Sequence, residues 1–302
     1  MAGGANPVRA ILYALGANFA IAISKYVAAF ITNSGSMLAE AVHSTADCGN
    51  QLLLLLGLKL SKPPPTHDYP LGYGKETYFW SFIVALMLFS VGGLFSAYEG
   101  WHKLHQPEPL SYPQLALGVL AFGIVAEALS MWGCIKEVNK IRGDDSLWRW
   151  FRTSRNAELV VIFGEDLAAL AGLVLAFCAV LATWVTGNPM WDALGGIAIG
   201  ALLIVVAIMV GIEVKQMLVG QGVDERVRKE MVAFVAAQPT VDRVLNLLSM
   251  QMGPEAMVAV KVQMKPAGTD VALIANVKAL EAKFREQFPQ VGFLFMEPDI
   301  QD

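Results

Sequence analysis

Six apolar runs, each long enough to cross a lipid bilayer as a helix, constrain this chain more than any other feature. A spanning helix needs about 20 mostly apolar residues, and lipid admits only structures that satisfy their own backbone hydrogen bonds. The runs cover residues 8–31, 37–60, 78–101, 115–135, 159–185 and 189–212. Only 16% of the 302 residues are charged, against about 25% in soluble domains. The sequence therefore predicts a six-helix, all-α transmembrane bundle.

The last part of the chain has a different pattern. Polar residues become frequent after the sixth run, so we expect a transmembrane domain over residues 1–213 and an α+β domain over 214–302. Helix, strand, strand, helix and strand are predicted at 224–237, 244–252, 256–264, 270–287 and 291–296. Alternating apolar residues mark the second strand, and Thr269 is placed to cap the second helix. This αββαβ order is metallochaperone-like.

Basic residues set the expected orientation. Lys and Arg gather beside the loops after the second and fourth runs, and Arg9 precedes the first run. By the positive-inside rule, both termini and the α+β domain should be cytoplasmic. No cleavable signal precedes the first run, so we expect an integral, multi-pass protein of a bacterial inner membrane. The net charge of −4 indicates no nucleic-acid partner.

Polar side chains recur at helical spacing inside the second run. Glu40, His43, Asp47 and Asn50 follow one another every three or four residues and so share one stripe of a helix. An ionisable side chain at mid-membrane depth is costly and usually lines a pathway or a site. Oxygen donors and an imidazole on one face suit a divalent metal ion. This stripe is the first candidate for function.

Several motifs together resemble one transporter family. They are the segment SGSMLAEAVHSTAD at residues 34–47, the loop PLGYGKE at 70–76, the tripeptide YEG at 98–100 and the α+β tail. In this order they are similar to the cation diffusion facilitator family, and most of all to its zinc transporter nine-like branch. The resemblance implies a homodimer that exports divalent cations, commonly zinc, against protons. It also implies a metal held between the second and fifth spans.

The resemblance assigns metal ligands by position. The family has two ligands four residues apart on each of these spans, which here match His43, Asp47 and Asp166, while Ile162 occupies the fourth position. Glu165 is the leading replacement, because helical side chains lean toward the N-terminus and its carboxylate can reach the patch beside Ile162. Competing candidates, as ligands or on a proton path, are Glu40, Asn50, Glu127 and a water molecule. Each acid could instead make a buried interhelical bond, with Lys25 as one possible partner.

The chemistry of the proposed ligands limits which metal ions the site would bind. An imidazole with two or three carboxylates favours zinc over magnesium or calcium, while manganese and iron(II) also fit. Where the family has loop histidines, this chain has Tyr69 and Tyr73, and only His67 and Asp68 stand nearby. The tail contains no His and no Cys. We therefore expect no strong second metal site in the loop or the tail, and we assign dimerisation to the tail.

The predicted function is secondary active export of divalent metal cations by metal/proton antiport with alternating access. The lipid bilayer, metal ions, protons and a second copy of the chain are the expected partners, with no resident cofactor. One alternative is a membrane-anchored scaffold or regulator that has lost transport, suggested by Ile162 and the two tyrosines. An intramembrane metalloenzyme is a further alternative, but no HExxH motif is present, so we expect no enzyme.

Overall fold

The computed structural model describes residues 7–32, 35–106 and 112–301, and the side chains of residues 28, 29 and 31–43 lie outside this description. The chain forms two compact units. The first comprises Met1–Lys59, Thr77–Arg152 and Ala157–Lys215. The second comprises Leu60–Glu76, Thr153–Asn156 and Gln216–Asp302.

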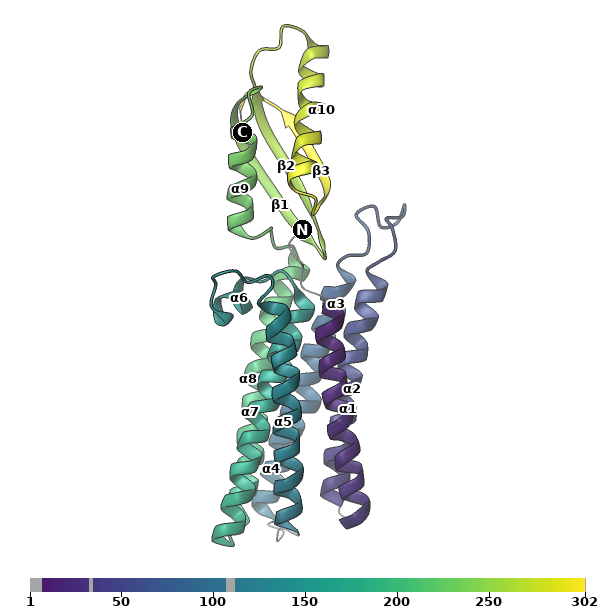
Figure 1. Ribbon diagram of the computed structural model, residues 1–302, viewed down its shortest axis with the longest axis vertical. Helices are drawn as coiled ribbons and strands as arrows, with labels where there is room; N and C mark the ends of the chain where they lie inside the picture. The colour runs from purple at the N-terminus through teal and green to yellow at the C-terminus, as the bar shows by residue number, and fades with distance from the viewer. Residues whose placement is uncertain (1–6, 33–34, 107–111, 302) are drawn as a thin grey trace. The chain divides into compact units, whose positions relative to one another are not determined.

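Long helices build the first unit and run side by side (Figure 1). Its described helices are α1 (Pro7–Thr32), α2 (Gly35–Leu60), α3 (Glu76–Met87), η1 (Leu88–Leu94), α4 (Phe95–His105), α5 (Pro113–Val138), α6 (Leu147–Thr153), α7 (Ala157–Thr186) and α8 (Met190–Val219). Five described helical stretches are long and apolar enough to cross a bilayer. The helix α2, with 26 residues, is the remaining span, and its polar stripe makes it less apolar. The predicted six-helix membrane bundle is confirmed.

Three features of the bundle differ from the sequence-based expectation. The third span is interrupted by the π-helical turn η1, and the short helix α6 was not predicted. The sixth span was predicted to end near residue 212, but α8 continues to Val219. Glu213 lies inside this extension with its carboxylate 2.7 Å from the guanidinium Nη1 of Arg152. Because this ion pair accommodates a buried acid, a charge at this position does not end the helix.

Small residues bring α4 and α8 into close contact. A Cβ atom on Gly100 would stand 2.5 Å from the backbone nitrogen of Ile197 and 2.8 Å from the carbonyl carbon of Gly196. Such contacts require glycine, and small residues are the usual means by which membrane helices approach closely. On the other side of the bundle, α5 packs against both α1 and α7. The second span is joined to α7 through hydrogen bonds described below.

The second unit contains a three-stranded sheet with the order β1-β2-β3. The strands are β1 (Val241–Met252), β2 (Glu255–Met264) and β3 (Val291–Pro298), with helices α9 (Glu225–Ala236) and α10 (Asp270–Gln287). Strands β1 and β2 are antiparallel, while β2 and β3 are parallel. Val258, Val260 and Phe284 are fully or almost fully buried in the core that the sheet shares with the helices. The predicted αββαβ order is confirmed.

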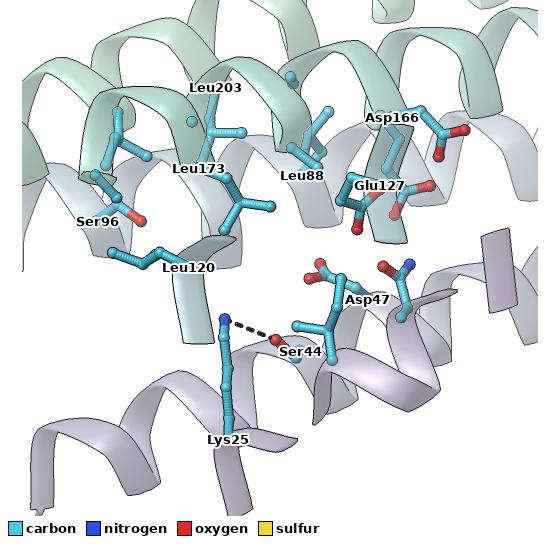
Figure 2. A pocket seen from close by; sticks show the side chains of 18 residues that line it. Lys25, Ser44, Asp47, Leu88, Ser96, Leu120, Glu127, Asp166, Leu173 and Leu203 are labelled. Carbon is cyan, nitrogen blue, oxygen red and sulfur yellow. Dashed lines mark hydrogen bonds between the residues drawn. The ribbon is translucent and has the colours of Figure 1, made fainter. Parts of the chain in front are cut away.

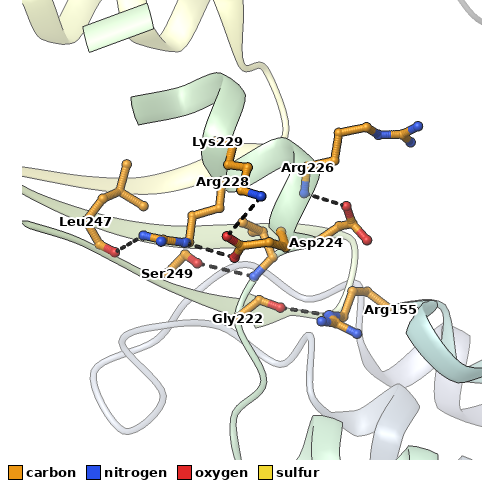
Figure 3. Close-up of polar contacts among 10 residues, drawn as sticks. Arg155, Gly222, Asp224, Arg226, Arg228, Lys229, Leu247 and Ser249 are labelled. Atoms are coloured by element: carbon orange, nitrogen blue, oxygen red, sulfur yellow. Dashed lines mark hydrogen bonds and ion pairs between the residues drawn. The ribbon is translucent and has the colours of Figure 1, made fainter. Parts of the chain in front are cut away.

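Local hydrogen bonds define where the helices of the second unit begin. The Thr269 side chain accepts a bond from the backbone nitrogen of Ala272, as predicted for a cap. At α9 the carboxylate of Asp224 accepts from the backbone nitrogen of Arg226 at 2.8 Å (Figure 3). Gly222, just before α9, accepts a hydrogen bond at its carbonyl oxygen from Arg155 at 2.7 Å. These contacts fix the chain where it enters the α+β fold.

Candidate functional site

Acidic side chains from three helices line one cavity in the first unit. The cavity has a volume of about 130 Å³, and Asp47 of α2, Glu127 of α5, and Glu165 and Asp166 of α7 contribute to its wall. Lys25 of α1 also lines it (Figure 2). The three acids on α5 and α7 are each no more than 5% exposed. The structure therefore gathers ionisable groups that are far apart in the sequence.

The cavity extends in one direction from these acids. We call the end of the first unit where α1 and α7 begin and α8 ends the proximal end, and the opposite end the distal end. On α7 the lining residues run from Glu165 distally to Ala176, a length of roughly 16 Å at 1.5 Å per residue. On the proximal side, Gln51 and Ile162 have no exposed surface. The two acids of α7 thus mark the proximal limit of the lining on that helix.

Asp166 is oriented by a hydroxyl group from the neighbouring helix α5. Ser130 donates a hydrogen bond to Asp166 Oδ2 at 3.0 Å. Ser130 follows Glu127 by three residues, so the two side chains share one face of α5. Asp166 is 1% exposed, and an uncompensated buried carboxylate is unfavourable. The hydroxyl leaves the other oxygen, Oδ1, available for a further partner.

Glu165 is held by two amides of α2. Asn50 Nδ2 donates to Glu165 Oε1 at 3.2 Å, and Gln51 Nε2 donates to Glu165 Oε2 at 2.7 Å. These bonds join the second span to the fifth. Within the described residues, the amide oxygens of Asn50 and Gln51 are buried without a hydrogen-bond partner. Glu165 therefore has an interhelical role in this conformation, alongside the ligand role predicted from the sequence.

The structure brings together part of the predicted site. Asp47, Glu165, Asp166 and the competing candidate Glu127 share the cavity, and Asn50 contacts Glu165. The side chains of His43 and Glu40 lie outside the described residues, although the α2 backbone continues through both positions. Ile162 is fully buried and apolar. Among the described side chains, no three His, Cys, Asp or Glu converge closely enough to hold a metal ion, and the ligand set stays a prediction.

The sequence did not predict how three polar side chains contribute to the cavity. Ser130 and Gln51 were not identified as donors to Asp166 and Glu165, and Lys25 was given only a general acid-pairing role. The signal for Ser130 is its position three residues from Glu127. For Gln51 the signal is adjacency to Asn50. The acid to which each of these two side chains donates depends on how the helices pack, and the sequence alone does not determine that packing.

The loop between α2 and α3 is where the sequence analysis considered a second metal site and expected no strong one. His67 and Asp68 have side chains about as exposed as in an extended chain, at 106% and 89%, with Nδ1 and Oδ1 3.9 Å apart. The rings of Tyr69 and Tyr73 lie 4.7 Å apart, and the Tyr73 hydroxyl is 3.2 Å from the Thr66 hydroxyl. The two tyrosines thus pack on one another at the positions where the family resemblance implies metal-binding histidines.

Membrane-spanning helices around buried ionisable groups define this molecule as a multi-pass membrane protein of the kind that moves ions. Residues 11–219 match the family described as the cation efflux transmembrane domain. The match covers more than half of the chain. The chain therefore belongs to the cation diffusion facilitator family, as its sequence motifs predict.

Individual relatives refine this placement. The chain is 32% identical over 252 residues to metal tolerance protein C4 of Arabidopsis thaliana, covering 82% of this chain and 54% of the relative. It is 28% identical over 251 residues to the mitochondrial proton-coupled zinc antiporter SLC30A9 of Mus musculus, and this match covers 82% of this chain and 44% of the relative. The cation-efflux pump FieF of Klebsiella pneumoniae is 25% identical over 260 residues, and this match covers 85% of this chain and 81% of the relative. The chain spans about half the length of the first two relatives, and its zinc transporter nine-like character is confirmed.

Proposed function

We propose that this chain is a secondary active exporter of divalent metal cations, that zinc is the preferred ion, and that protons move in exchange. The observation that carries the proposal is the meeting of four carboxylates from three helices in one cavity within the membrane-spanning unit. Keeping several acids inside a membrane is costly, and a dication offsets their charge. Membership of the cation efflux family supports the same function.

We propose His43, Asp47, Asp166 and Glu165 as the metal ligands. His43 and Asp47 are four positions apart, so both lie on one face of α2. A carboxylate oxygen has lone pairs for two partners, so Glu165 can bind an ion while it keeps its amide donors, or after they release it. This mixed donor set favours zinc and also admits manganese or iron(II). Glu40, Asn50 and Glu127 are auxiliary or proton-path candidates.

Proton exchange follows from the chemistry of these ligands. Metal ions bind neutral imidazole and ionised carboxylates, so protons and metal compete for the same groups. Protonation on one side of the membrane would release the ion there, and metal binding on the other side would expel the protons. The helices that carry the ligands would rock between two openings around a site near the membrane midplane. No covalent chemistry is required, so the proposal is a transporter and not an enzyme.

Orientation, membrane and assembly complete the proposal. Basic residues at the proximal end of the first unit, among them Lys136, Lys140 and Arg149, favour a cytoplasmic location for that end. A bacterial inner membrane is the proposed location, and a bacterial efflux pump is among the relatives. A homodimer is the proposed assembly. Export would then proceed from the proximal to the distal end.

Metal-dependent proton flux in proteoliposomes tests the transport proposal. Asp47→Ala and Asp166→Asn each remove a proposed ligand and should reduce zinc-driven proton flux at least tenfold, while the protein stays folded. Asp192→Asn is the matched control, because Asp192 pairs with Lys103 at 3.4 Å and does not line the cavity. It should keep most of the wild-type flux. Wild-type flux in both cavity variants would remove the proposed site.

The competing function is a scaffold or regulator without transport, for which Ile162 in place of a ligand is the motivating observation. Isothermal titration with zinc separates the two. A transporter should bind zinc stoichiometrically with loss of affinity in Asp47→Ala, whereas a scaffold should show no stoichiometric zinc binding at all.

A further inference from the structure

Lys25 is a buried cation in the wall of the carboxylate cavity. It lies in the distal part of the first membrane span, seven residues before the end of α1, and is only 7% exposed. Lysines in membrane helices usually extend to the interface, where water solvates the ammonium group. The Lys25 side chain instead points into the cavity, where its Nζ donates to Ser44 Oγ at 2.9 Å (Figure 2). A buried ammonium requires compensating negative charge, and the acids that line the same cavity are the available source of it.

Lys25 lies on the distal side of the acids. Helix α2 runs from the distal to the proximal end, and Ser44, the partner of Lys25, precedes Asp47 by about one turn. On α1, which runs in the opposite direction, Lys25 is two turns distal to Asn18, another lining residue. Glu165 and Asp166 mark the proximal limit of the lining on α7. An ion that moves from these acids toward the distal end therefore passes the ammonium group.

We propose that Lys25 is a tethered cation that competes with the transported ion for the cavity carboxylates and speeds its release toward the distal side. This inference rests on the proposed function and concerns the same cavity. Two cations in one cavity of low dielectric constant repel strongly. The ammonium weakens metal binding while the metal is present and neutralises part of the acid charge once it has left. Lys25 thus keeps a carboxylate-rich site from holding the metal too tightly for turnover.

Two neutral variants separate the charge of Lys25 from its packing. Lys25→Met keeps an unbranched apolar side chain of similar length, while Lys25→Gln keeps a hydrogen-bond donor. Lys25→Arg keeps the positive charge, and Ser44→Ala removes the hydrogen-bond acceptor but leaves the ammonium in place. Zinc affinity is measured by isothermal titration on the full-length protein in nanodiscs. Zinc release is measured as the efflux rate from proteoliposomes.

Both neutral variants should bind zinc about tenfold more tightly than the wild type, within the usual range of coupling between two sites, and should turn over more slowly. Lys25→Arg and Ser44→Ala should keep affinities close to the wild type. A purely structural role predicts the opposite sign, because local damage weakens binding. Unchanged or weaker zinc binding in the neutral variants, with a wild type that binds, overturns the role of Lys25 alone. A wild type that binds no zinc overturns the proposed function and this inference together.

Discussion

At the scale of single residues, the cavity combines strong charges with few neutral donors. Asp166 receives one hydroxyl donor, from Ser130, and Glu165 receives two amide donors, from Asn50 and Gln51. Bonds to a charged acceptor are about twice as strong as those between neutral groups. They fix the carboxylates before any ion arrives, and a preorganised site loses less entropy on binding. The donors are therefore part of the proposed site even though they need not touch the proposed metal ion.

Replacing Gln51 tests the bond that joins α2 to α7. Gln51→Leu should lower the free energy of unfolding by roughly 1–3 kcal/mol, because Glu165 Oε2 then loses its 2.7 Å donor in a buried position. Chemical denaturation in detergent micelles measures the change. Gln114→Leu, at an exposed position of α5, is the control and should stay within about 0.5 kcal/mol of the wild type. Equal stability of the two variants would show that the bond contributes nothing.

Asp299 provides a pH-dependent contact in the second unit. Its carboxylate accepts a hydrogen bond from Lys261 Nζ at 3.0 Å and another from the backbone nitrogen of Ile300, and these lower the pKa of Asp299 below its ordinary value of 3.8. A lowered folded-state pKa stabilises the fold above the unfolded-state pKa, and this stabilisation is lost as the pH falls through the folded value. Lys261→Met should raise the pKa of Asp299 toward 3.8. Carboxyl NMR titration of the aspartate-labelled full-length protein measures it, and no rise would contradict the assigned cause.

At the scale of elements, the third span departs most from a regular helix. Its π-helical turn η1 includes Gly92 and Gly93, and Leu88 at its start lines the cavity. A Cβ atom on Gly93 would come within 2.6 Å of the Ile204 side chain of α8. A π-helical turn inserts an extra residue and often occurs at functional sites. The irregular turn and the cavity therefore meet on the same part of this span.

The glycine contact between α4 and α8 gives a prediction for this pair of helices. Gly100→Ala places a methyl group 2.5 Å from the backbone of Ile197, and such overpacking costs about 1–3 kcal/mol. The melting temperature in detergent should fall. Gly118→Ala on α5 is the matched control, because no atom lies within 4 Å of the added Cβ. Alanine is the better helix former, so this variant should melt at or above the wild-type temperature, and a parallel fall in both would refute the packing argument.

Which elements could be predicted depends on what their sequences encode. Apolar length alone reveals the spans, and Thr269 reveals the start of α10 through its capping side chain. A membrane helix that is apolar all round does not indicate which side faces its neighbours, so the sequence could not place Glu127 and Lys25 in one cavity. The π-helical turn was missed because it does not interrupt the hydrophobic composition of the third span. The helix α6 was missed because its seven residues, with two arginines, are too few to show a helical apolar period. Asp47 and Asp166 were paired through family resemblance, and the structure places both in that cavity.

At the scale of the whole molecule, the proposed homodimer needs a surface that one copy leaves open. The β-sheet has α9 and α10 on one face, where Val258 and Val260 are buried. On the opposite face the strand register aligns Leu248, Ala259 and Phe295 in one row across the sheet. Leu248 is 65% exposed and Phe295 is 56% exposed. Large apolar side chains exposed on one face of a sheet are typical of an interaction surface.

If a second copy covers this row, charged residues there should dissociate the dimer. Leu248→Lys and Phe295→Lys each place an ammonium group at one end of the apolar row, where it would lose its hydration on association. Mass photometry of the full-length protein in detergent should show a larger monomer fraction, with the double variant affected most. Val271→Lys is the control, because Val271 is 78% exposed on α10 and does not belong to the row. A dimer fraction that stays at the wild-type level in the double variant would place the dimer interface elsewhere on the molecule, whereas dissociation by the control as well would point to a general effect of added charge.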